Sequence, residues 1–289
     1  MEINWYPGHM AKAKRLLADQ IARTDLIVEL CDARLPFSSR NPDLEKMIGN
    51  RNHILFLNKA DLADPAVTEQ WLKYFRAQGI PAWAITANNN RAKESIRRIN
   101  EATADIVKKY ADRGVRKGMK VMVIGVPNVG KSTYINHLHG SGITQTGDRP
   151  GVTKANQWVK IGPYLDLMDS PGLLWPRLDD QTAARRLCYI GSVKDDVVDL
   201  AMLTIHLLQD LLAVKPESVA ERFHLTDPTV RGADLLDAVC RGRGFLLKGG
   251  VPDYDRCCSV VLDEFRAGKL GRITLETPET GEPDNNTEA

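Results

Sequence analysis

Apolar residues form two alternating patterns from the start of the chain to about residue 175. Short runs rich in Val, Ile and Leu have the length and composition of buried strands. Between them, apolar residues recur at helical spacing, as Met10, Ala13, Leu17 and Ile21 do near the start. Strands separated by helices predict an α/β domain whose mostly parallel sheet has helices on both faces. The expected strands span 25–32, 53–57, 80–85, 121–124, 155–161 and 164–169.

Beyond Trp175 only helical patterns follow, which predicts a second, small all-α domain. We therefore expect an α/β domain over 1–176 and a helical domain over 177–275. The remaining residues, 276–289, hold five acids and no base, together with Pro, Gly and Asn. This composition predicts an acidic disordered tail. The helices expected in the second domain cover 197–212, 216–223, 232–241 and 253–266.

The composition, 43% hydrophobic and 26% charged residues, is that of an ordinary globular protein. No apolar run approaches the roughly 18 residues that span a bilayer, and the first residues match neither a signal peptide nor a transit peptide. The five cysteines show no C-x-x-C spacing, which argues against a zinc site or a disulfide framework. We therefore expect a cytoplasmic protein that does not bind membranes.

The net charge of +2 conceals an uneven distribution of charge. Without the five acids of the predicted tail, the rest of the chain carries about +7. Residues 91–120 alone contain ten Lys or Arg against four acids. On charge alone, a solvated helix face is the better interpretation. The alternative is a surface that faces a polyanion such as RNA.

One stretch carries a specific chemical signal. The apolar run Val121–Ile124 leads into Gly125-x-x-x-x-Gly130-Lys131-Ser132, and a helical pattern follows. This is the phosphate-binding P-loop in the strand–loop–helix setting that it requires. Backbone N–H groups hold phosphate oxygens, Lys131 reaches the β- and γ-phosphates, and the Ser132 hydroxyl ligates Mg²⁺. The alternative is a glycine-rich turn without function, but every motif position and both flanks fit. The loop predicts a nucleoside triphosphate without naming the base.

Two further strand ends indicate which base is bound. Asn58-Lys59-Ala60-Asp61 follows one expected strand. A carboxylate such as that of Asp61 can accept both the N1–H and the 2-amino N–H of guanine, a donor pair that adenine does not offer. Lys59 would cover the base and Asn58 would tie loops together. Thr86-Ala87-Asn88 follows another strand and would present a backbone N–H to guanine O6. Together these strand ends describe one crevice in an open α/β sheet.

The order of the motifs is unusual. Asp169-x-x-Gly172 ends another expected strand and suits a carboxylate in the second shell of Mg²⁺ and a backbone N–H for the γ-phosphate. Thr153 belongs with the same phosphate motifs. In ordinary GTPases the P-loop precedes the base-reading motif, whereas here it follows it. A circular permutation that joins the old termini through 111–118 explains this order and leaves the sheet unchanged.

The ordered motifs resemble the circularly permuted GTPases of the YlqF/YawG type, most closely the ribosome biogenesis GTPase A family. The resemblance is dense over residues 1–175. The helical domain over 177–275 is similar in length and character, and the resemblance implies that it binds RNA or the ribosome. The resemblance also implies a GTPase that acts late in assembly of the large (50S) ribosomal subunit. The matching segments are W-Y-P-G-H-M-A-K-A from Trp5, D-A-R-L-P from Asp32, N-K-A-D from Asn58, G-V-P-N-V-G-K-S-T from Gly125, R-P-G-V-T from Arg149 and D-S-P-G from Asp169.

The motifs and the resemblance give a list of expected site residues. GTP would be bound by Asn58, Lys59, Ala60, Asp61, Thr86, Ala87, Asn88, Asn128, Val129, Gly130, Lys131, Ser132, Thr133, Thr153 and Gly172. Mg²⁺ would be held by Ser132 and Thr153, with Asp169 in its second shell, and related P-N-V-G-K-S loops imply that Asn128 ligates K⁺. His9 is expected to orient the attacking water, since the family places its proposed catalytic His at this position and an imidazole can accept a proton.

Three functions compete. The leading hypothesis is a GTP-hydrolysing switch that binds rRNA and ribosomal proteins of a large-subunit precursor and is activated by that particle. The position after Asp169-x-x-Gly172 is Leu173, which cannot orient water as the Gln of Ras-like enzymes does, so intrinsic turnover should be slow. The first alternative is a GTP-binding, RNA-binding module with little or no turnover. The second, a small-molecule kinase, is disfavoured by the guanine motifs. We expect a monomer when the protein is off the ribosome.

Overall fold

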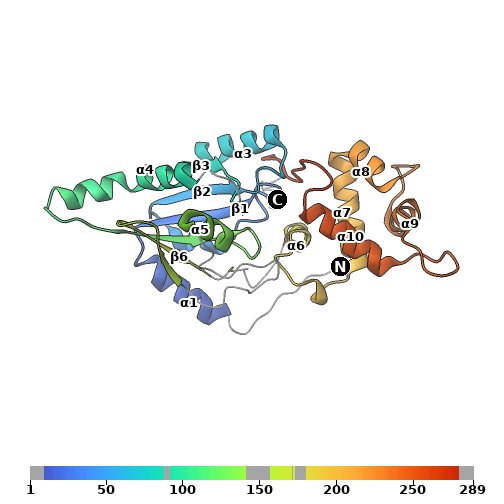
Figure 1. The fold of residues 1–289 in the computed structure, drawn as a ribbon, viewed down its shortest axis with the longest axis horizontal. Coiled ribbons are helices and arrows are strands. Elements are labelled where there is room, and N and C mark those ends of the chain that lie inside the picture. The colour runs from blue at the N-terminus through green and yellow to red at the C-terminus, as the bar shows by residue number, and fades with distance from the viewer. Residues whose placement is uncertain (1–9, 88–91, 141–156, 171, 173–179, 280–289) are drawn as a thin grey trace, which may run out of the picture.

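The computed structural model describes residues 10–87, 92–140, 157–170, 172 and 180–279 (Figure 1). Its centre is a six-stranded sheet in the order β3-β2-β1-β4-β6-β5, in which only β5 is antiparallel to its neighbour. This confirms the mostly parallel sheet predicted from the sequence. The strands are β1 (Leu26–Asp32), β2 (His53–Asn58), β3 (Ala82–Ala84), β4 (Met119–Ile124), β5 (Gln157–Lys160) and β6 (Leu165–Asp169).

Helices cover both faces of the sheet. Every residue of β1 is buried, which explains why its sequence is an almost continuous apolar run. One face packs against α4 (Ala92–Ala111) and α5 (Lys131–His139) through buried residues such as Ile99 and Ile135. The opposite face packs against α1 (Met10–Ile21), α2 (Pro42–Ile48) and α3 (Pro65–Ala77). Of these helices, the short α2 was not expected.

The helical part lies at one end of the molecule, and α4 extends towards the other (Figure 1). It consists of α6 (Gln181–Tyr189), a short 3₁₀ turn (Asp195–Val197), α7 (Leu200–Val214), α8 (Pro216–Phe223), α9 (Gly232–Gly242) and α10 (Tyr254–Arg266). The apolar α7 packs against the other four helices, which is why so much of it is hydrophobic. Buried residues of α6 continue the core of the sheet domain into the helical part.

The chain returns from α10 to the sheet domain. The backbone N–H of Ile273 donates to the Leu62 carbonyl, and that of Leu275 donates to the Arg34 carbonyl. Glu276, which the sequence assigned to a disordered tail, is only 1% exposed. For this residue the tail prediction is wrong, because its carboxylate is bound by donors from residues 37, 38 and 186, which are distant in the sequence. Within the described ranges, no helix is long and apolar enough to cross a membrane.

Candidate nucleotide site

The carboxyl ends of four neighbouring parallel strands meet at one edge of the sheet. Asp32 ends β1, Asn58 ends β2, Asp169 ends β6, and the P-loop follows β4. In open α/β sheets this edge is where ligands bind. Sequence positions that are far apart in the chain are therefore brought together, as the motifs predicted.

The P-loop ends where α5 begins, at Gly130, whose φ is 96°. A Cβ on this residue would lie 2.5 Å from the side-chain nitrogen of Asn58, so only glycine fits. The next residue, Lys131, is 6% exposed, and its ammonium donates to the Val126 carbonyl at 2.9 Å. Burial lowers the pKa of Lys131 to about 8, against the opposing effect of Asp169. Among the described residues no carboxylate lies within ion-pair distance of this ammonium, which suits it to a phosphate.

Ser132 and Asp169 are in direct contact. The Ser132 hydroxyl donates to Asp169 Oδ2 at 2.7 Å, and Asp169 is fully buried. A hydroxyl at a helix N-terminus beside a buried carboxylate fits Mg²⁺, a hard cation that prefers oxygen ligands and keeps some of its waters. Ser132 can serve as the direct ligand, with Asp169 accepting a hydrogen bond from a metal-bound water. The other expected Mg²⁺ ligand, Thr153, lies outside the described residues.

Asn58 links the two halves of the site. Its Nδ2 donates to the Val129 carbonyl at 2.7 Å, and its Oδ1 accepts from the Ala87 N–H at 3.0 Å. One buried side chain thus joins the P-loop to the loop after β3, which confirms the bridging role predicted for it. Thr86 and Ala87 lie beside this bridge, whereas Asn88 lies outside the described residues.

Lys59 connects the base-reading motif to the P-loop. Its ammonium donates to the Asn128 carbonyl at 2.7 Å and lies 3.2 Å from Asp32 Oδ2. Lys59 and Asn128 have φ angles of 58° and 62°, a left-handed conformation that is unfavourable for lysine and that asparagine adopts more readily. Such strain is typical of functional sites. Asp61 is exposed at the end of the same loop, where it can reach a ligand.

Gly172 lies directly against the P-loop. A Cβ added to it would come within 2.6 Å of the Pro127 nitrogen. The preceding Ser170 hydroxyl donates to the Val123 carbonyl at 2.6 Å, which fixes the start of this loop on β4. Gly172 and the P-loop are therefore close enough for both to contact one phosphate group. The position of Leu173 lies outside the described residues.

The sequence did not predict that the helical part contacts the P-loop. Asn128 Nδ2 donates to the Gly191 carbonyl at 2.6 Å, and the Ser192 hydroxyl donates to the Pro127 carbonyl at 2.7 Å. Gly191 and Ser192 follow α6 in a segment without a recognisable motif, so no local signal could have identified them. Asn128, the expected K⁺ ligand, thus also connects the P-loop to the helical part.

Asp32 and Arg34 form a buried ion pair that the sequence analysis did not predict. Arg34 donates to both Asp32 oxygens, at 2.9 and 2.8 Å, and to the Phe265 carbonyl at 2.8 Å. Burial raises the pKa of the Asp32 carboxyl, but Arg34 and Lys59 outweigh that effect and hold it below its ordinary value. The feature of the sequence that could have indicated this pair is the position of Asp32, a carboxylate at the end of a buried strand.

The remaining expected residues are less informative. Ala60 donates its N–H to the Ile85 carbonyl, Val129 is fully buried, and Thr133 is exposed on the first turn of α5. His9, expected to be catalytic, lies outside the described residues. The structure therefore assembles most of the expected nucleotide-binding residues in one place.

Known proteins show the same combination of motifs and fold. Residues 120–227 match the family described as 50S ribosome-binding GTPase. The ribosome biogenesis GTPase A of Bacillus cereus is 42% identical, with 96% of this chain and 95% of the relative covered. That of Thermotoga maritima is 30% identical, with 96% and 95% covered. The crystal structure of GNP-bound YlqF from T. maritima matches with a TM-score of 0.68 at 25% identity, over 93% of this chain and 99% of that one.

The relatives at 30–42% identity are matched over almost their full length, so the similarity covers the helical part as well as the sheet domain. The fold is a circularly permuted P-loop GTPase domain followed by a small helical domain. On this evidence the chain belongs to the ribosome biogenesis GTPase A family.

Proposed function

We propose that this protein hydrolyses GTP as an assembly factor for a late step of large (50S) ribosomal subunit formation, slowly by itself and faster on the ribosomal particle. The observation that carries the proposal is the shared crevice: Asn58 joins the P-loop to the guanine-reading loops, and Lys131 and Ser132 stand at its phosphate end. The names of the relatives support the ribosomal role. Five free, buried cysteines are consistent with work in the cytoplasm.

Different residues bind the guanine base and the phosphates. The Asp61 carboxylate accepts two N–H groups of guanine, while the stem of Lys59 covers the base. Lys131 and the backbone N–H groups of the P-loop hold the phosphates, and the Gly172 N–H receives the γ-phosphate. Ser132 and Thr153 would hold Mg²⁺, with Asp169 behind them. The bound ion supplies positive charge that offsets the charge developing on the β- and γ-phosphates.

Two groups would complete the reaction. His9 would accept a hydrogen bond or a proton from the attacking water when the protein docks on the particle. Asn128 Oδ1 would ligate K⁺, whose charge stands where an arginine finger stands in other GTPases. We also propose that the protein is a monomer when it is off the particle, and that it contacts rRNA and ribosomal proteins when bound.

The test is GTP hydrolysis with and without large-subunit precursor particles, in KCl and in NaCl. Wild-type turnover should rise on the particle and be faster in KCl. His9→Ala should still bind GTP and the particle, but its particle-stimulated rate should be roughly 10²–10⁴-fold lower than that of the wild type, which is the usual contribution of a general acid–base group. If particles and K⁺ leave turnover negligible while GTP still binds, the protein is the GTP-binding, RNA-binding module instead.

A further inference from the structure

A groove lies at the edge of the sheet opposite the nucleotide site. It is bordered by the C-terminal half of α4, the segment 112–118 and Tyr164, and its volume is about 920 Å³. Met119, the first residue of β4, lines the groove, whereas the P-loop follows the last residue of that strand. A six-residue strand is about 20 Å long, so the groove and the phosphate site are well separated. Segment 112–118 is the connection that the circular permutation requires.

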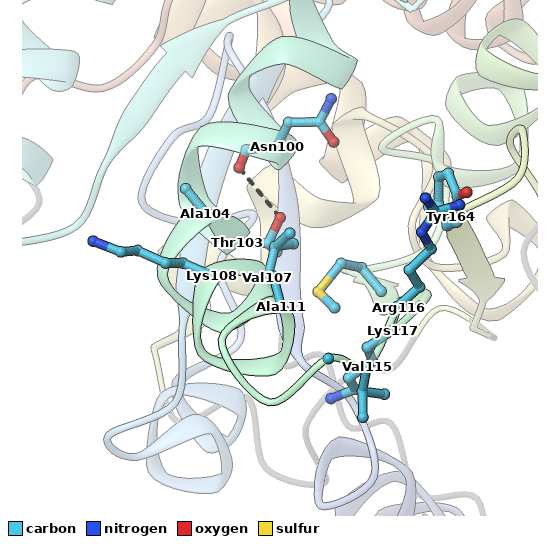
Figure 2. Close-up of a pocket in the computed structure, with 12 residues that line it drawn as sticks. Asn100, Thr103, Ala104, Val107, Lys108, Ala111, Val115, Arg116, Lys117 and Tyr164 are labelled. Atoms are coloured by element: carbon cyan, nitrogen blue, oxygen red, sulfur yellow. Dashed lines mark hydrogen bonds between the residues drawn. The ribbon is translucent and has the colours of Figure 1, made fainter.

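The lining of the groove is apolar and open to solvent. Figure 2 shows Val107 and Ala111 of α4 on one wall and Arg116 and Tyr164 on the other. Val107, Val115 and Tyr164 are 45%, 49% and 53% exposed. A concave apolar surface of this kind, with an aromatic ring at its side, is a typical ligand site.

The charges on α4 are divided into two groups. In the first half of the helix, Arg97 and Arg98 form ion pairs with Glu94 and Glu101. In the second half and the connection after it, Lys108, Lys109, Arg113 and Arg116 are exposed, and no described carboxylate lies within ion-pair distance of them. Lys117 is the exception, since it contacts Asp25 and lies 4.5 Å from the Tyr110 ring centroid. These four cations around the groove therefore lack the ion pairs that neutralise Arg97 and Arg98 in the first half of α4.

The chain that borders the groove is rich in cations. Residues 108–120 contain six Lys or Arg and one acid, Asp112. Exposed rings among uncompensated cations are what a single nucleic acid strand requires, because bases stack on the rings while phosphates pair with the cations.

We propose that this groove binds an unstacked nucleotide of a single-stranded or bulged RNA segment. The base would enter between Val107, Val115 and Tyr164, and Lys108 and Arg116 would hold the adjoining phosphates. An A-form helix cannot insert a base into a pocket of this shape, which is why a loop or bulge is the expected ligand. The proposal rests on the proposed function, since the ribosomal particle would supply the RNA. It places an RNA contact on the sheet domain, at the end of the molecule opposite the helical part (Figure 1).

The chain offers a matched pair of double variants. Lys108→Gln with Arg116→Gln removes two uncompensated charges at the groove, whereas Lys93→Gln with Arg97→Gln removes two charges at the other end of α4. All four residues are exposed, so both variants should fold. Tyr164→Ala removes the ring and Tyr164→Phe keeps it. None of these residues belongs to the nucleotide site, and basal GTP hydrolysis should equal that of wild type.

The measurement is fluorescence anisotropy of a labelled oligouridylate at several salt concentrations, with thiouridine crosslinking to locate the contact. The groove pair should weaken binding roughly tenfold and flatten the salt dependence by about 1.4 units of slope, because each of the two lost phosphate contacts contributes ~0.7 on a single strand. Tyr164→Ala should weaken binding roughly tenfold through lost stacking, with recovery in Tyr164→Phe. The control pair should change little, and crosslinks should map to residues 107–119 and to Tyr164.

The proposal fails if both double variants weaken binding equally, if Tyr164→Ala binds RNA as wild type does, or if crosslinks fall elsewhere. It also fails if the groove variants bind oligouridylate normally but bind the particle poorly, since the groove would then hold a protein segment. The proposed function is tested separately. If the wild type shows no particle-stimulated turnover, that function fails whatever the groove variants do.

Discussion

At the scale of single residues, the nucleotide site contains groups that are unfavourable until a ligand is bound. Lys131 is a buried ammonium whose one hydrogen bond in the described structure is to a carbonyl. Lys59 and Asn128 hold left-handed backbone conformations. A bound phosphate would compensate the charge of Lys131, and a bound nucleotide would use the shape that the strained residues maintain. The site therefore lowers the stability of the nucleotide-free protein in return for a preformed phosphate cradle.

Replacing Lys131 by Met should stabilise the nucleotide-free protein at pH 7 by about 1–3 kcal/mol while abolishing nucleotide binding. Burial lowers the pKa of Lys131 to about 8, so at pH 7 the folded protein holds a proton that its surroundings disfavour. The penalty is complete below pH 8 and disappears as the pH rises towards the ordinary value of 10.5. Wild-type stability should therefore increase through that window, and that of Lys131→Met should not.

Urea unfolding of nucleotide-free protein at pH 7 and at a pH between 8 and 10.5 measures both effects. Lys93→Met, an exposed lysine on α4, is the control and should leave stability within about 0.5 kcal/mol of wild type. A Lys131→Met protein that is less stable than wild type at pH 7 would show that the ammonium is already well compensated.

At the scale of elements, local patterns predicted most of the fold. The strands were predicted from continuous apolar runs, because the central ones are buried on both faces. The long α4 and the helix at 216–223 were predicted from helical spacing and helix-end residues, because each buries one apolar face. The strand-end residues Asn58 and Asp169 were predictable for a related reason, since parallel strands end at one edge of a sheet. The sequence-based predictions failed for features that depend on contacts between residues far apart in the chain. Gly191 and Ser192 meet the P-loop through tertiary packing, and Glu276 is an acid in acidic surroundings whose partners lie elsewhere in the chain.

Glu276 anchors the returning segment, so Glu276→Ala should cost about 2–5 kcal/mol of stability. Its carboxylate accepts from the N–H of Phe37 at 2.7 Å, from the N–H and hydroxyl of Ser38, and from Arg186 at 3.3 Å. Removing it leaves several buried donors without this acceptor. Glu279→Ala makes the same change in charge at an exposed position and should cost less than about 0.5 kcal/mol. Equal denaturation midpoints for the two variants would contradict this anchoring role.

At the scale of the whole molecule, the helical part is held against the sheet domain at several places. The core continues through α6, Arg34 of the sheet domain bonds to the Phe265 carbonyl, and Ile273 and Leu275 pair with backbone groups of residues 62 and 34. The helical part also meets the P-loop, the loop that would hold the phosphates, through Gly191 and Ser192. A signal from the nucleotide should therefore enter the helical part at the end of α6.

Ser192→Ala should weaken the response of the helical part to the nucleotide. In the wild type, the amides of Gly191 and Ser192 donate to the Cys188 and Leu187 carbonyls, so their hydrogen exchange reports opening of this turn. We expect exchange to be slower with a non-hydrolysable GTP analogue than with GDP, because a fully occupied P-loop holds the Pro127 carbonyl that Ser192 binds. One hydrogen bond contributes about 1 kcal/mol, so its loss should speed exchange about fivefold and reduce the difference between nucleotides. Ser259→Ala, at an exposed position of α10, should exchange as wild type does. If Ser192→Ala keeps the full nucleotide-dependent difference, the signal must reach the helical part by another route, such as the chain that leaves Gly172.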